Sequence, residues 1–436
     1  MKIIDKLSQI WKEIDYPFII NNGQELKFSQ IKSVPSLDLK SIKPGDVVAI
    51  IGDFNPLSIL TLLQLIDLNA IVVPLTTETE SQHEYFFDSA LVDVVIRNSS
   101  VTRRIHDHNH HLLDLLRSKK HAGLILFSTG STGRPKAILH DLTLFFQRYE
   151  TPRPTLRTLS FLLFDHIGGL NTLFHTLFNK GVIISSPTRT VDSVLKTCEN
   201  FNIEVLPTTP TFLRLMLLSG AVPDRVPQCL KVITYGTERM DQHTLSTLCR
   251  SLPWVDFRQT FGMSELGILR VKSVSRDSLY MKIGGEGIET KVEDNVLWIK
   301  SESRMLGYLN ADSPFINEWF NTKDIVDEQN GSFRIIGRNT DTINVGGIKF
   351  MPSEVENLAL AYPGIKFATV IAKNNPITGQ HPEMLIEIDP SESTFSTADF
   401  KQYLKDRLPQ HMVPRRIRIE SAQIGHRYKK LSSQSE

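Results

Sequence analysis

Residues 123–136 read Gly-Leu-Ile-Leu-Phe-Ser-Thr-Gly-Ser-Thr-Gly-Arg-Pro-Lys, an apolar run followed at once by a loop rich in glycine and hydroxyl side chains. The run 123–127 is typical of a buried strand. In the loop, glycines let backbone N–H groups approach an anion, hydroxyls donate hydrogen bonds, and Lys136 supplies a positive charge. The loop does not end in Gly-Lys-Ser/Thr, so it is not a P-loop. Because short Gly/Ser stretches also form plain turns, it is a candidate phosphate site that the rest of the chain has to support.

Strands and helices alternate through the first 335 or so residues. Val47–Ile51 is typical of a buried strand, Asn55 and Pro56 of a helix start, and Ile71–Val73 of the next strand. A strand–helix–strand order predicts parallel pairing. Further strands are expected at residues 182–184, 203–206 and 231–234, with a helix at 192–200. The fold class is therefore α/β, with a large N-terminal domain of layered sheets over residues 1–337.

The last hundred residues have their own set of elements. Helices are expected at 353–360 and 396–408, the second opening with a Ser-x-x-Asp capping pattern. Strands are expected at 367–372, 384–388 and 416–420. The polar run 338–341 separates these elements from the large domain and marks the expected boundary. Residues 342–436 are therefore expected to form a small α+β domain.

Composition is that of an ordinary soluble protein, with 41% hydrophobic and 22% charged residues. The formal net charge is +1, so no overall field favours nucleic acid, and the basic stretch 401–430 fits a solvated surface better than a nucleic-acid patch. Three cysteines without metal-ligand spacing fit a reducing compartment. The N-terminus lacks a signal peptide's apolar core, and Asp67 and Asn69 interrupt the longest apolar stretch. We expect a cytoplasmic protein with no membrane span and no nucleic-acid partner.

Residues 126–141 (LFSTGSTGRPKAILHD) resemble the signature of the adenylate-forming superfamily, with Ala137 where Gly is usual. Its members include acyl- and aryl-CoA synthetases, luciferases and peptide-synthetase adenylation domains. At least five motifs of the family occur in the expected order between Val47 and Leu431. The resemblance implies that ATP and a carboxylic acid form an acyl-adenylate with release of pyrophosphate, and that the acyl group then passes to a thiol. It implies ATP, Mg²⁺ and, as probable co-substrate, CoA.

The resemblance also implies the nucleotide-binding residues, although each segment alone would fit a turn or a linker. In 261–265 an aromatic ring can stack on adenine, a serine can bind phosphate, and Glu265 is a hard oxygen ligand suited to Mg²⁺. Asp324 stands in Asn-Thr-Lys-Asp, where Thr-Gly-Asp is usual, and would accept hydrogen bonds from the ribose. The implied set is Ser128, Thr129, Gly130, Ser131, Thr132, Gly133, Lys136, Tyr235, Gly236, Thr237, Glu238, Phe261, Gly262, Met263, Ser264, Asp324 and Arg338, with Glu265 as the metal ligand.

Two implied catalytic positions lie far apart in the chain. His166, in Phe-Asp-His-Ile-Gly-Gly, matches an aromatic-His-x-x-Gly stretch that borders the acyl site. A lone histidine among apolar residues is as often a core residue. The family's C-terminal Gly-Lys is altered, because residues 424–431 read Ile-Gly-His-Arg-Tyr-Lys-Lys-Leu. Ungapped counting from Pro414 favours Lys430 as the catalytic lysine, and a one-residue shift gives Lys429.

The resemblance implies that residues 338–341 are a hinge, that the small domain is mobile, and that the second half-reaction uses the segment after the hinge. Asp341 closes a Gly-Arg-x-x-Asp match and is the implied hinge residue. Gly346 and Gly347 would approach the thiol once the small domain has turned, although a Gly pair also fits an ordinary hairpin.

Two alternatives stay open. The first is a ligase that loads an acyl-carrier protein in place of CoA. The second is a non-catalytic nucleotide- or acyl-binding protein, which the altered C-terminal signature favours. The chain is shorter than a typical member, mostly before the phosphate loop, so the sequence does not identify the acid.

Overall fold

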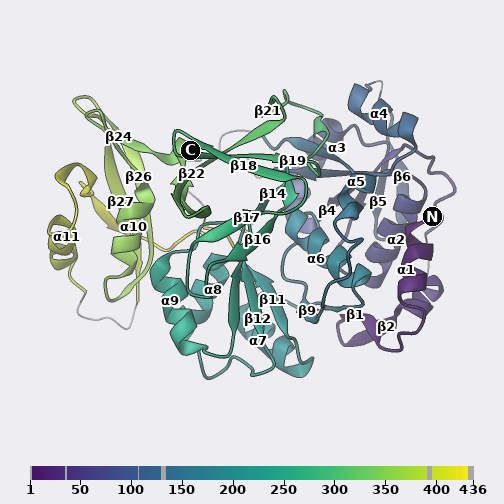
Figure 1. Ribbon diagram of the computed structural model, residues 1–436, viewed down its shortest axis with the longest axis horizontal. Helices are drawn as coiled ribbons and strands as arrows, with labels where there is room; N and C mark the ends of the chain where they lie inside the picture. The colour runs from purple at the N-terminus through teal and green to yellow at the C-terminus, as the bar shows by residue number, and fades with distance from the viewer. Residues whose placement is uncertain (1, 35–36, 107, 129–133, 390–394, 431–436) are drawn as a thin grey trace.

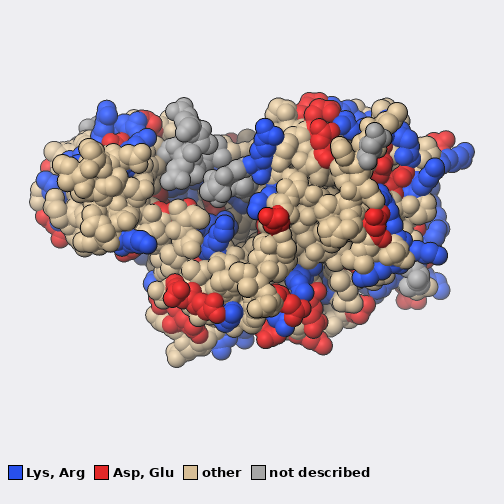
Figure 2. Space-filling view, turned by 90° about the horizontal axis from the view of Figure 1, so that it is seen from above, with Lys and Arg blue, Asp and Glu red and all other residues tan. Residues whose placement is uncertain are grey.

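The computed structural model describes residues 2–34, 37–106, 108–128, 134–389 and 395–430. Thr129, Gly130, Ser131, Thr132 and Gly133 of the expected phosphate loop lie outside the described residues. The chain forms an elongated molecule, with the elements that follow residue 342 gathered at the end opposite the N-terminus (Figure 1). On the face shown in Figure 2, acidic and basic side chains are interspersed.

The first seven-stranded sheet contains the strand that leads into the phosphate loop. Its central strands β3 (Val47–Ile51), β4 (Ile71–Leu75) and β7 (Gly123–Phe127) pair in parallel. The expected strand–helix–strand unit is confirmed, since Asn55 Oδ1 accepts from Ser58 N at 2.9 Å and begins α2 (Pro56–Asp67). The remaining strands are β5 (Val94–Arg97), β6 (Ser100–Arg103), β8 (Ala137–Asp141) and β20 (Gly307–Tyr308), and nearby helices are α1 (Ile3–Ile10), α3 (His83–Ala90), α4 (His111–Lys119) and α5 (Leu142–Gln147).

A second seven-stranded sheet carries the other large α/β unit. Its strands in spatial order are β13 (Asp256–Gln259), β12 (Val232–Tyr235), β11 (Val205–Thr208), β9 (Arg157–Leu159), β10 (Val182–Ile184), β1 (Pro17–Asn21) and β2 (Gln24–Lys27). All neighbours except β1 and β2 pair in parallel. Apolar side chains of the sheet pack against α7 (Val191–Asn200), α8 (Pro210–Leu218) and α9 (Gln242–Ser251), which lie on one side of it in Figure 1. The strands and the helix expected in this region are confirmed, with boundary shifts of one or two residues.

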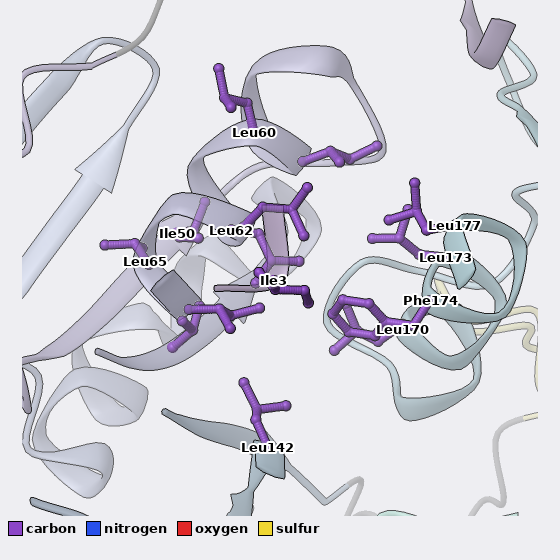
Figure 3. Packing of buried hydrophobic residues seen from close by; sticks show 14 of the residues in the cluster. Ile3, Ile50, Leu60, Leu62, Leu65, Leu142, Leu170, Leu173, Phe174 and Leu177 are labelled. Carbon is purple, nitrogen blue, oxygen red and sulfur yellow. The ribbon is translucent and has the colours of Figure 1, made fainter. Parts of the chain in front are cut away.

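Helix α6 (Ile167–Phe178) is apolar on one side. Leu170, Leu173, Phe174 and Leu177 repeat at helical spacing and belong to the same core cluster as Ile3 of α1 and Leu62 of α2 (Figure 3). This packing fixes the helix in the large domain and turns its opposite side away from that core.

A third, antiparallel sheet contains β16 (Arg270–Ser273), β17 (Met281–Gly284), β18 (Ile288–Glu293), β19 (Val296–Ser301), β21 (Phe315–Ile316), β22 (Trp319–Gln329) and β23 (Ser332–Arg338). The short hairpin of β14 (Gly262–Met263) and β15 (Gly267–Ile268) lies just before it in the chain. The sequence analysis did not assign these strands.

The small domain is a five-stranded sheet with two helices. Its strands are β24 (Ile343–Val345), β25 (Ile348–Phe350), β26 (Ile365–Asn375), β27 (Gly379–Ile388) and β28 (Ile417–Ile419), and its helices are α10 (Pro352–Leu360) and α11 (Thr397–Lys405). The expected α+β elements are confirmed, and Ser396 caps α11 by accepting from Asp399 N at 3.2 Å. The short 3₁₀ turn η3 (Asn339–Asp341) joins this sheet to the third one.

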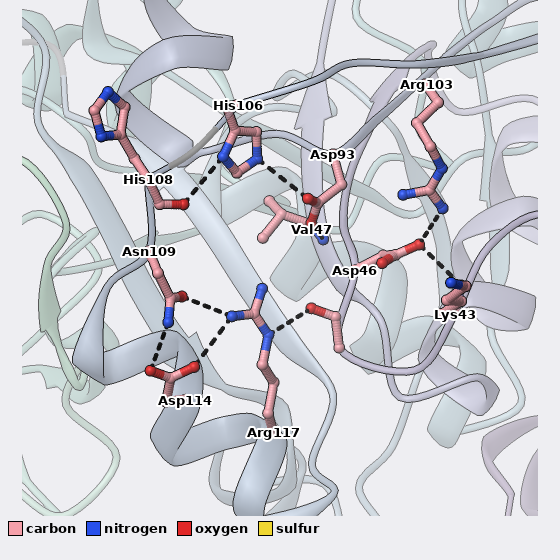
Figure 4. A network of polar contacts seen from close by, with 11 residues as sticks. Lys43, Asp46, Val47, Asp93, Arg103, His106, His108, Asn109, Asp114 and Arg117 are labelled. Carbon is pink, nitrogen blue, oxygen red and sulfur yellow. Dashed lines mark hydrogen bonds and ion pairs between the residues drawn. The ribbon is translucent and has the colours of Figure 1, made fainter.

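A polar network fixes the loops at the start of β3 and β5 (Figure 4). Asp93 accepts from Val47 N at 2.7 Å and from His106 Nε2 at 3.1 Å, while Arg103 pairs with Asp46 at 2.7 Å. These contacts satisfy backbone and charged groups at the edge of the first sheet, and none of these residues lines the cavity described below. Within the described ranges, no helix is both long and apolar enough to cross a bilayer.

Candidate functional site

A cavity of about 780 Å³ lies between α6, the second sheet, the β14–β15 hairpin and the C-terminal residues. Its wall includes Thr158, Val205 and Val232, which are register neighbours on β9, β11 and β12. One side of the second sheet, with both polar and apolar residues, is thus one wall, while the other side packs on α7, α8 and α9. This places the cavity beside the ends of several loops that the sequence analysis singled out.

The base of the phosphate loop is on this cavity. Ser128 and Lys136 both line it, and two hydrogen bonds close the loop between them: Ser128 N to Lys136 O at 3.1 Å, and Lys136 N to Ser128 Oγ at 3.0 Å. The Lys136 ammonium lies 4.7 Å from the ring centre of Tyr308. The strand-to-loop junction therefore holds a positive charge at the cavity wall.

Glu265 lies on the same wall. Tyr308 donates to Glu265 Oε1 at 2.8 Å, and among the described residues no hydrogen bond is made to the second carboxylate oxygen, which is available for a ligand. No group of three or more His, Cys, Asp or Glu side chains suited to a metal ion occurs among the described residues. A cation at this carboxylate would accordingly need oxygen atoms from a ligand to complete its shell.

Gly262, Met263 and Ser264 line the cavity beside Glu265. A Cβ on Gly262 would lie 2.7 Å from Gly267 O, so the β14–β15 hairpin requires glycine there. His140 holds the next turn, with Nε2 2.6 Å from Ser264 O, and burial lowers the pKa of His140 to about 4. The neutral His140 ring therefore donates its Nε2 hydrogen to Ser264 O. His140 was not foreseen, because its role depends on a contact 124 residues along the chain.

Phe261 does not line the cavity. Its ring packs against the core of the third sheet. The expected aromatic platform for adenine is therefore not provided by this side chain in the present arrangement.

Only one residue of the segment 235–238 lines the cavity. Thr237 does so, with a φ of +72°, whereas Tyr235 is 1% exposed and packs in the core of the second sheet. A Cβ on Gly236 would lie 2.2 Å from Thr260 Oγ1. The absence of a side chain at Gly236 therefore lets its backbone pack closely against Thr260, rather than against a ligand. Glu238 accepts from Thr211 N at 2.7 Å and does not line the cavity. The side chains of Tyr235 and Glu238 thus do not line the cavity in this structure, and their contact with a nucleotide stays a prediction.

Asp324 and Arg338 lie together at another part of the site. Asp324 is buried, its Oδ1 is 3.5 Å from Arg338 Nε, and burial raises its pKa to about 6 against the opposing effect of Arg338. Arg338 lines the cavity, as do the three residues before Asp324. The carboxylate is thus next to the cavity wall, and its binding of ribose stays a prediction.

The C-terminal residues form a hairpin that reaches the cavity; we call residues 424–430 the C-terminal hairpin. Ile424 bridges Lys430, Gly425 N donates to Lys429 O at 2.9 Å, and Tyr428 adopts a φ of +52°. Lys429 lines the cavity, and burial lowers its pKa to about 8, with Glu238 opposing and Arg427 and Arg338 adding to the shift. The turn thus aims this lysine at the site.

Lys430 has a different position. Its Nζ donates to Ala368 O at 2.6 Å and lies 3.4 Å from Glu356 Oε1, both in the small domain. In this arrangement Lys429 faces the cavity, whereas the Lys430 side chain is turned toward the small domain. The preference for Lys430 is not supported by this geometry, and the shifted register, Lys429, is.

Several contacts fasten the C-terminal hairpin to the large domain, including the following. Arg427 Nη2 lies 3.1 Å from Asp165 Oδ2, Thr209 Oγ1 donates to Tyr428 O at 2.7 Å, and the Tyr428 ring packs on Phe161 at 5.4 Å. The sequence analysis did not single out Asp165 or Arg427. Two opposite charges 262 residues apart carry no local signal in the sequence.

His166 lines the cavity next to this ion pair. It is the N-cap of α6, where Nδ1 accepts from Gly168 N at 3.0 Å. Burial, with Arg427 and Lys429 nearby, lowers the pKa of His166 well below its usual value. The neutral ring therefore carries its hydrogen on Nε2.

The residues expected for the second half-reaction lie outside the cavity. Asp341 is exposed in η3, and Gly346 and Gly347 form the exposed β24–β25 turn with φ of +61° and +90°. None of the three lines the cavity. Their proposed roles need another domain orientation.

Comparison with known families gives two matches along the chain. Residues 36–309 match the AMP-binding enzyme family, and residues 354–423 match the AMP-binding enzyme C-terminal domain. The chain is 25% identical to 4-coumarate--CoA ligase-like 6 of Arabidopsis thaliana, over 67% of its own length and 58% of that protein's. It is 24% identical to the 2-succinylbenzoate--CoA ligase of Listeria monocytogenes, over 92% and 91%.

A third relative acts on a different acceptor. The chain is 25% identical to the medium/long-chain-fatty-acid--[acyl-carrier-protein] ligase FadD10 of Mycobacterium tuberculosis, over 56% of this chain and 52% of that protein. Among solved structures, o-succinylbenzoate CoA synthetase of Bacillus subtilis in complex with its acyl-adenylate intermediate superposes with a TM-score of 0.80 at 19% identity, over 99% and 97% of the two chains. The fold, the motif order and the two matched regions agree, and the chain belongs to the AMP-binding enzyme family, within the adenylate-forming superfamily that residues 126–141 resemble.

Proposed function

We propose that this chain is an AMP-forming acid–thiol ligase, which converts a carboxylic acid and ATP into an acyl-adenylate and then transfers the acyl group to CoA. The observation that carries the proposal is the position of Lys429. The C-terminal hairpin inserts this lysine into a cavity whose wall also holds Lys136 and Glu265. The position of Lys429 argues against the non-catalytic alternative that the altered C-terminal signature had favoured.

In the proposed first step, a carboxylate oxygen of the acid attacks the α-phosphorus of ATP. The bond to the bridging oxygen breaks, and pyrophosphate leaves with the electron pair. Lys136 and Ser128 would hold the terminal phosphates, and Lys429 would offset the charge that gathers at the α-phosphate. Neutral His166 would border the acyl group and offer its Nε2 hydrogen.

Mg²⁺ belongs to this proposal as a companion of ATP. In nucleotide sites this ion is held by one or two carboxylates together with phosphate oxygens, which fits the single carboxylate of Glu265 with its unoccupied second oxygen. When bound, the ion would offset negative charge on the phosphates.

In the proposed second step, the small domain turns about η3. The Arg427–Asp165 pair and the Thr209–Tyr428 bond would break, Lys429 would leave, and the turn at Gly346 and Gly347 would enter beside the thiol. The thiol sulfur attacks the acyl carbon and its proton passes to solvent; the bond from that carbon to the phosphate oxygen breaks, and AMP leaves with the electron pair. A few residues of η3 would absorb the change in φ and ψ.

An acyl-carrier protein is the second candidate acceptor, because the ligase FadD10 is among the relatives. The basic stretch 401–430 suits an acidic carrier as well as the phosphates of CoA. A cytoplasmic location is also part of the proposal, and the three free cysteines, Cys198, Cys229 and Cys249, fit a reducing compartment.

The test is product analysis with the purified protein, ATP, Mg²⁺ and a panel of acids. The proposal predicts AMP and pyrophosphate only when an accepted acid is present, and an acyl thioester when CoA is added. Thioester on a phosphopantetheinylated carrier but never on CoA would select the second acceptor. ADP as product, or no acid-dependent AMP with any acid while ATP still binds, would contradict the proposed activity.

A further inference from the structure

The cavity-facing side of α6 begins with Ile167 and Gly168 and is polar from Asn171 to Thr176. Residues 167, 168, 171, 172, 175 and 176 line the cavity and form one stripe at helical spacing. The opposite stripe, Leu170, Leu173, Phe174 and Leu177, is the apolar one that packs in the core (Figure 3). A cavity for a plain hydrocarbon chain would place apolar side chains on both stripes, because polar groups that lose water without a partner cost free energy.

Hydrogen bonds fix which atoms remain for a ligand. Tyr149 donates to Asn171 Oδ1 at 2.9 Å, so the amide nitrogen of Asn171 is the group left over. Thr172 donates to Gly168 O at 2.8 Å, so its hydroxyl hydrogen is already used inside the helix. Asn171 is therefore a donor on the cavity wall, while Thr172 is a polar neighbour without a free donor.

The tautomer of His175 follows from its neighbour. Asn179 Oδ1 accepts from Arg153 N at 2.6 Å, which assigns the Asn179 amide nitrogen as a donor. That nitrogen donates to His175 O at 2.8 Å and lies 3.3 Å from His175 Nδ1, which accepts. Since burial lowers the pKa of His175, the ring is neutral and its hydrogen is on Nε2. His175 is thus a second donor on the stripe.

Arg153 adds a charge at the same end. It lines the cavity, and among the described residues no carboxylate forms an ion pair with its guanidinium. In contrast, Arg258, Arg338 and Arg427, which also line the cavity, lie beside Asp256, Asp324 and Asp165. The single carboxylate of the described lining is Glu265, on the phosphate side.

We infer that the acid activated by this chain carries a second oxygen-bearing group on its chain, best matched by a second carboxylate, and that Asn171, His175 and Arg153 bind that group. The inference rests on the proposed function. At 1.5 Å per residue, Asn171 lies about 8 Å and His175 about 13 Å along the helix axis from His166, where the reacting carboxyl is expected. An extended carbon chain advances about 1.3 Å per C–C bond, so an acid of about seven or eight carbons spans the distance to Asn171, and a shorter acid depends on the reach of the side chains.

The test compares acids of equal length that differ in the second group: butanoate with 3-hydroxybutanoate and succinate, and octanoate with 8-hydroxyoctanoate and suberate. Binding is measured by calorimetry on the full-length protein with α,β-methylene-ATP, which cannot release pyrophosphate. We expect the oxygen-bearing member of at least one set to bind at least about tenfold more tightly than its alkyl partner, as for a buried hydrogen bond to a charged group. Equal binding within both sets, binding of none, or preference for the alkyl acids would overturn the inference.

Substitutions test which side chains bind the second group of the acid. Asn171→Leu and His175→Leu should reduce the preference for the oxygen-bearing acid, and Arg153→Gln should weaken only the dicarboxylate. Thr172→Val is the matched control, since its hydroxyl donor is committed to Gly168 O. A preference that survives in all three variants would contradict the assignment. Because binding is measured without turnover, binding of an oxygen-bearing acid without acid-dependent AMP would count against the proposed function and leave this inference standing.

Discussion

Arg427 in the C-terminal hairpin and Asp165 next to His166 form an ion pair, with Nη2 and Oδ2 3.1 Å apart. The side chains are 13% and 4% exposed, so the pair is largely shielded from water. Arg427 follows the small domain in the chain and would move with it in the proposed rotation, whereas Asp165 belongs to the loop that begins α6. The pair therefore ties the position of Lys429, two residues from Arg427, to the large domain.

Asp165→Asn is expected to slow adenylation by at least about tenfold, because an uncompensated buried charge on Arg427 disfavours docking of the hairpin. Acyl transfer from a preformed acyl-adenylate should stay within about twofold, since the proposed second step breaks the same pair. The two half-reactions are measured separately. Asp192→Asn, which removes an exposed pair with Arg225, is the control and should change neither. Equal losses in both half-reactions would show that Asp165 only supports the fold.

The pH dependence of adenylation should reflect Lys429. Burial is the main cause that lowers its pKa to about 8, so the ammonium form is present below that pH and is lost as the pH rises through it. If the charge is needed, kcat/KM for ATP in the exchange reaction falls above about pH 8. In Lys429→Arg this alkaline fall should move to higher pH, because a guanidinium stays protonated. An unchanged alkaline limb in that variant would assign the titration to another group.

Glu265→Gln should raise the Mg²⁺ concentration needed for half-maximal rate and lower turnover by about 10²-fold or more, since a carbonyl oxygen is a weaker ligand than a carboxylate. Tyr308→Phe keeps the carboxylate and removes only the hydrogen bond to it, so its Mg²⁺ requirement should change much less. The readout is a Mg²⁺ titration of pyrophosphate exchange. The same Mg²⁺ dependence in wild type and Glu265→Gln would remove Glu265 from the metal site.

Asp341→Pro should spare adenylate formation and block acyl transfer. Proline fixes φ near −65° and removes a backbone donor, so η3 would lose the freedom that the proposed rotation needs. Asp341→Ala, which keeps that freedom, is the control for loss of the side chain. Transfer at the wild-type rate in the proline variant would place the hinge elsewhere. Loss of both activities with the fold intact would give Asp341 a part in the first step.

The sequence predicted the elements whose signals are local. The cap at Asn55, the parallel unit around α2, and the small α+β domain follow from capping, periodicity and order along the chain. The order of the motifs also singled out Ser128, Lys136 and Glu265, and all three line the cavity in the structure.

What the sequence could not resolve depends on side-chain direction. Tyr235 turns into the core, and whether Lys429 or Lys430 faces the cavity is decided by a turn with Tyr428 at positive φ. The donors on α6 depend on hydrogen bonds made by Tyr149 and Asn179, and the Asp165–Arg427 pair joins residues of two domains. None of these relationships has a pattern in the neighbouring sequence.

The most direct test of the account is acid-dependent pyrophosphate exchange in wild type, Lys429→Ala and Lys430→Ala, with an acid that the wild type accepts. Because Lys429 lines the cavity and Lys430 bonds to Ala368 O in the small domain, we expect Lys429→Ala to lose at least about 10²-fold in rate and Lys430→Ala to stay within about tenfold. Exchange at the wild-type rate in Lys429→Ala, or no exchange by the wild type with any acid while ATP binds, would contradict the account.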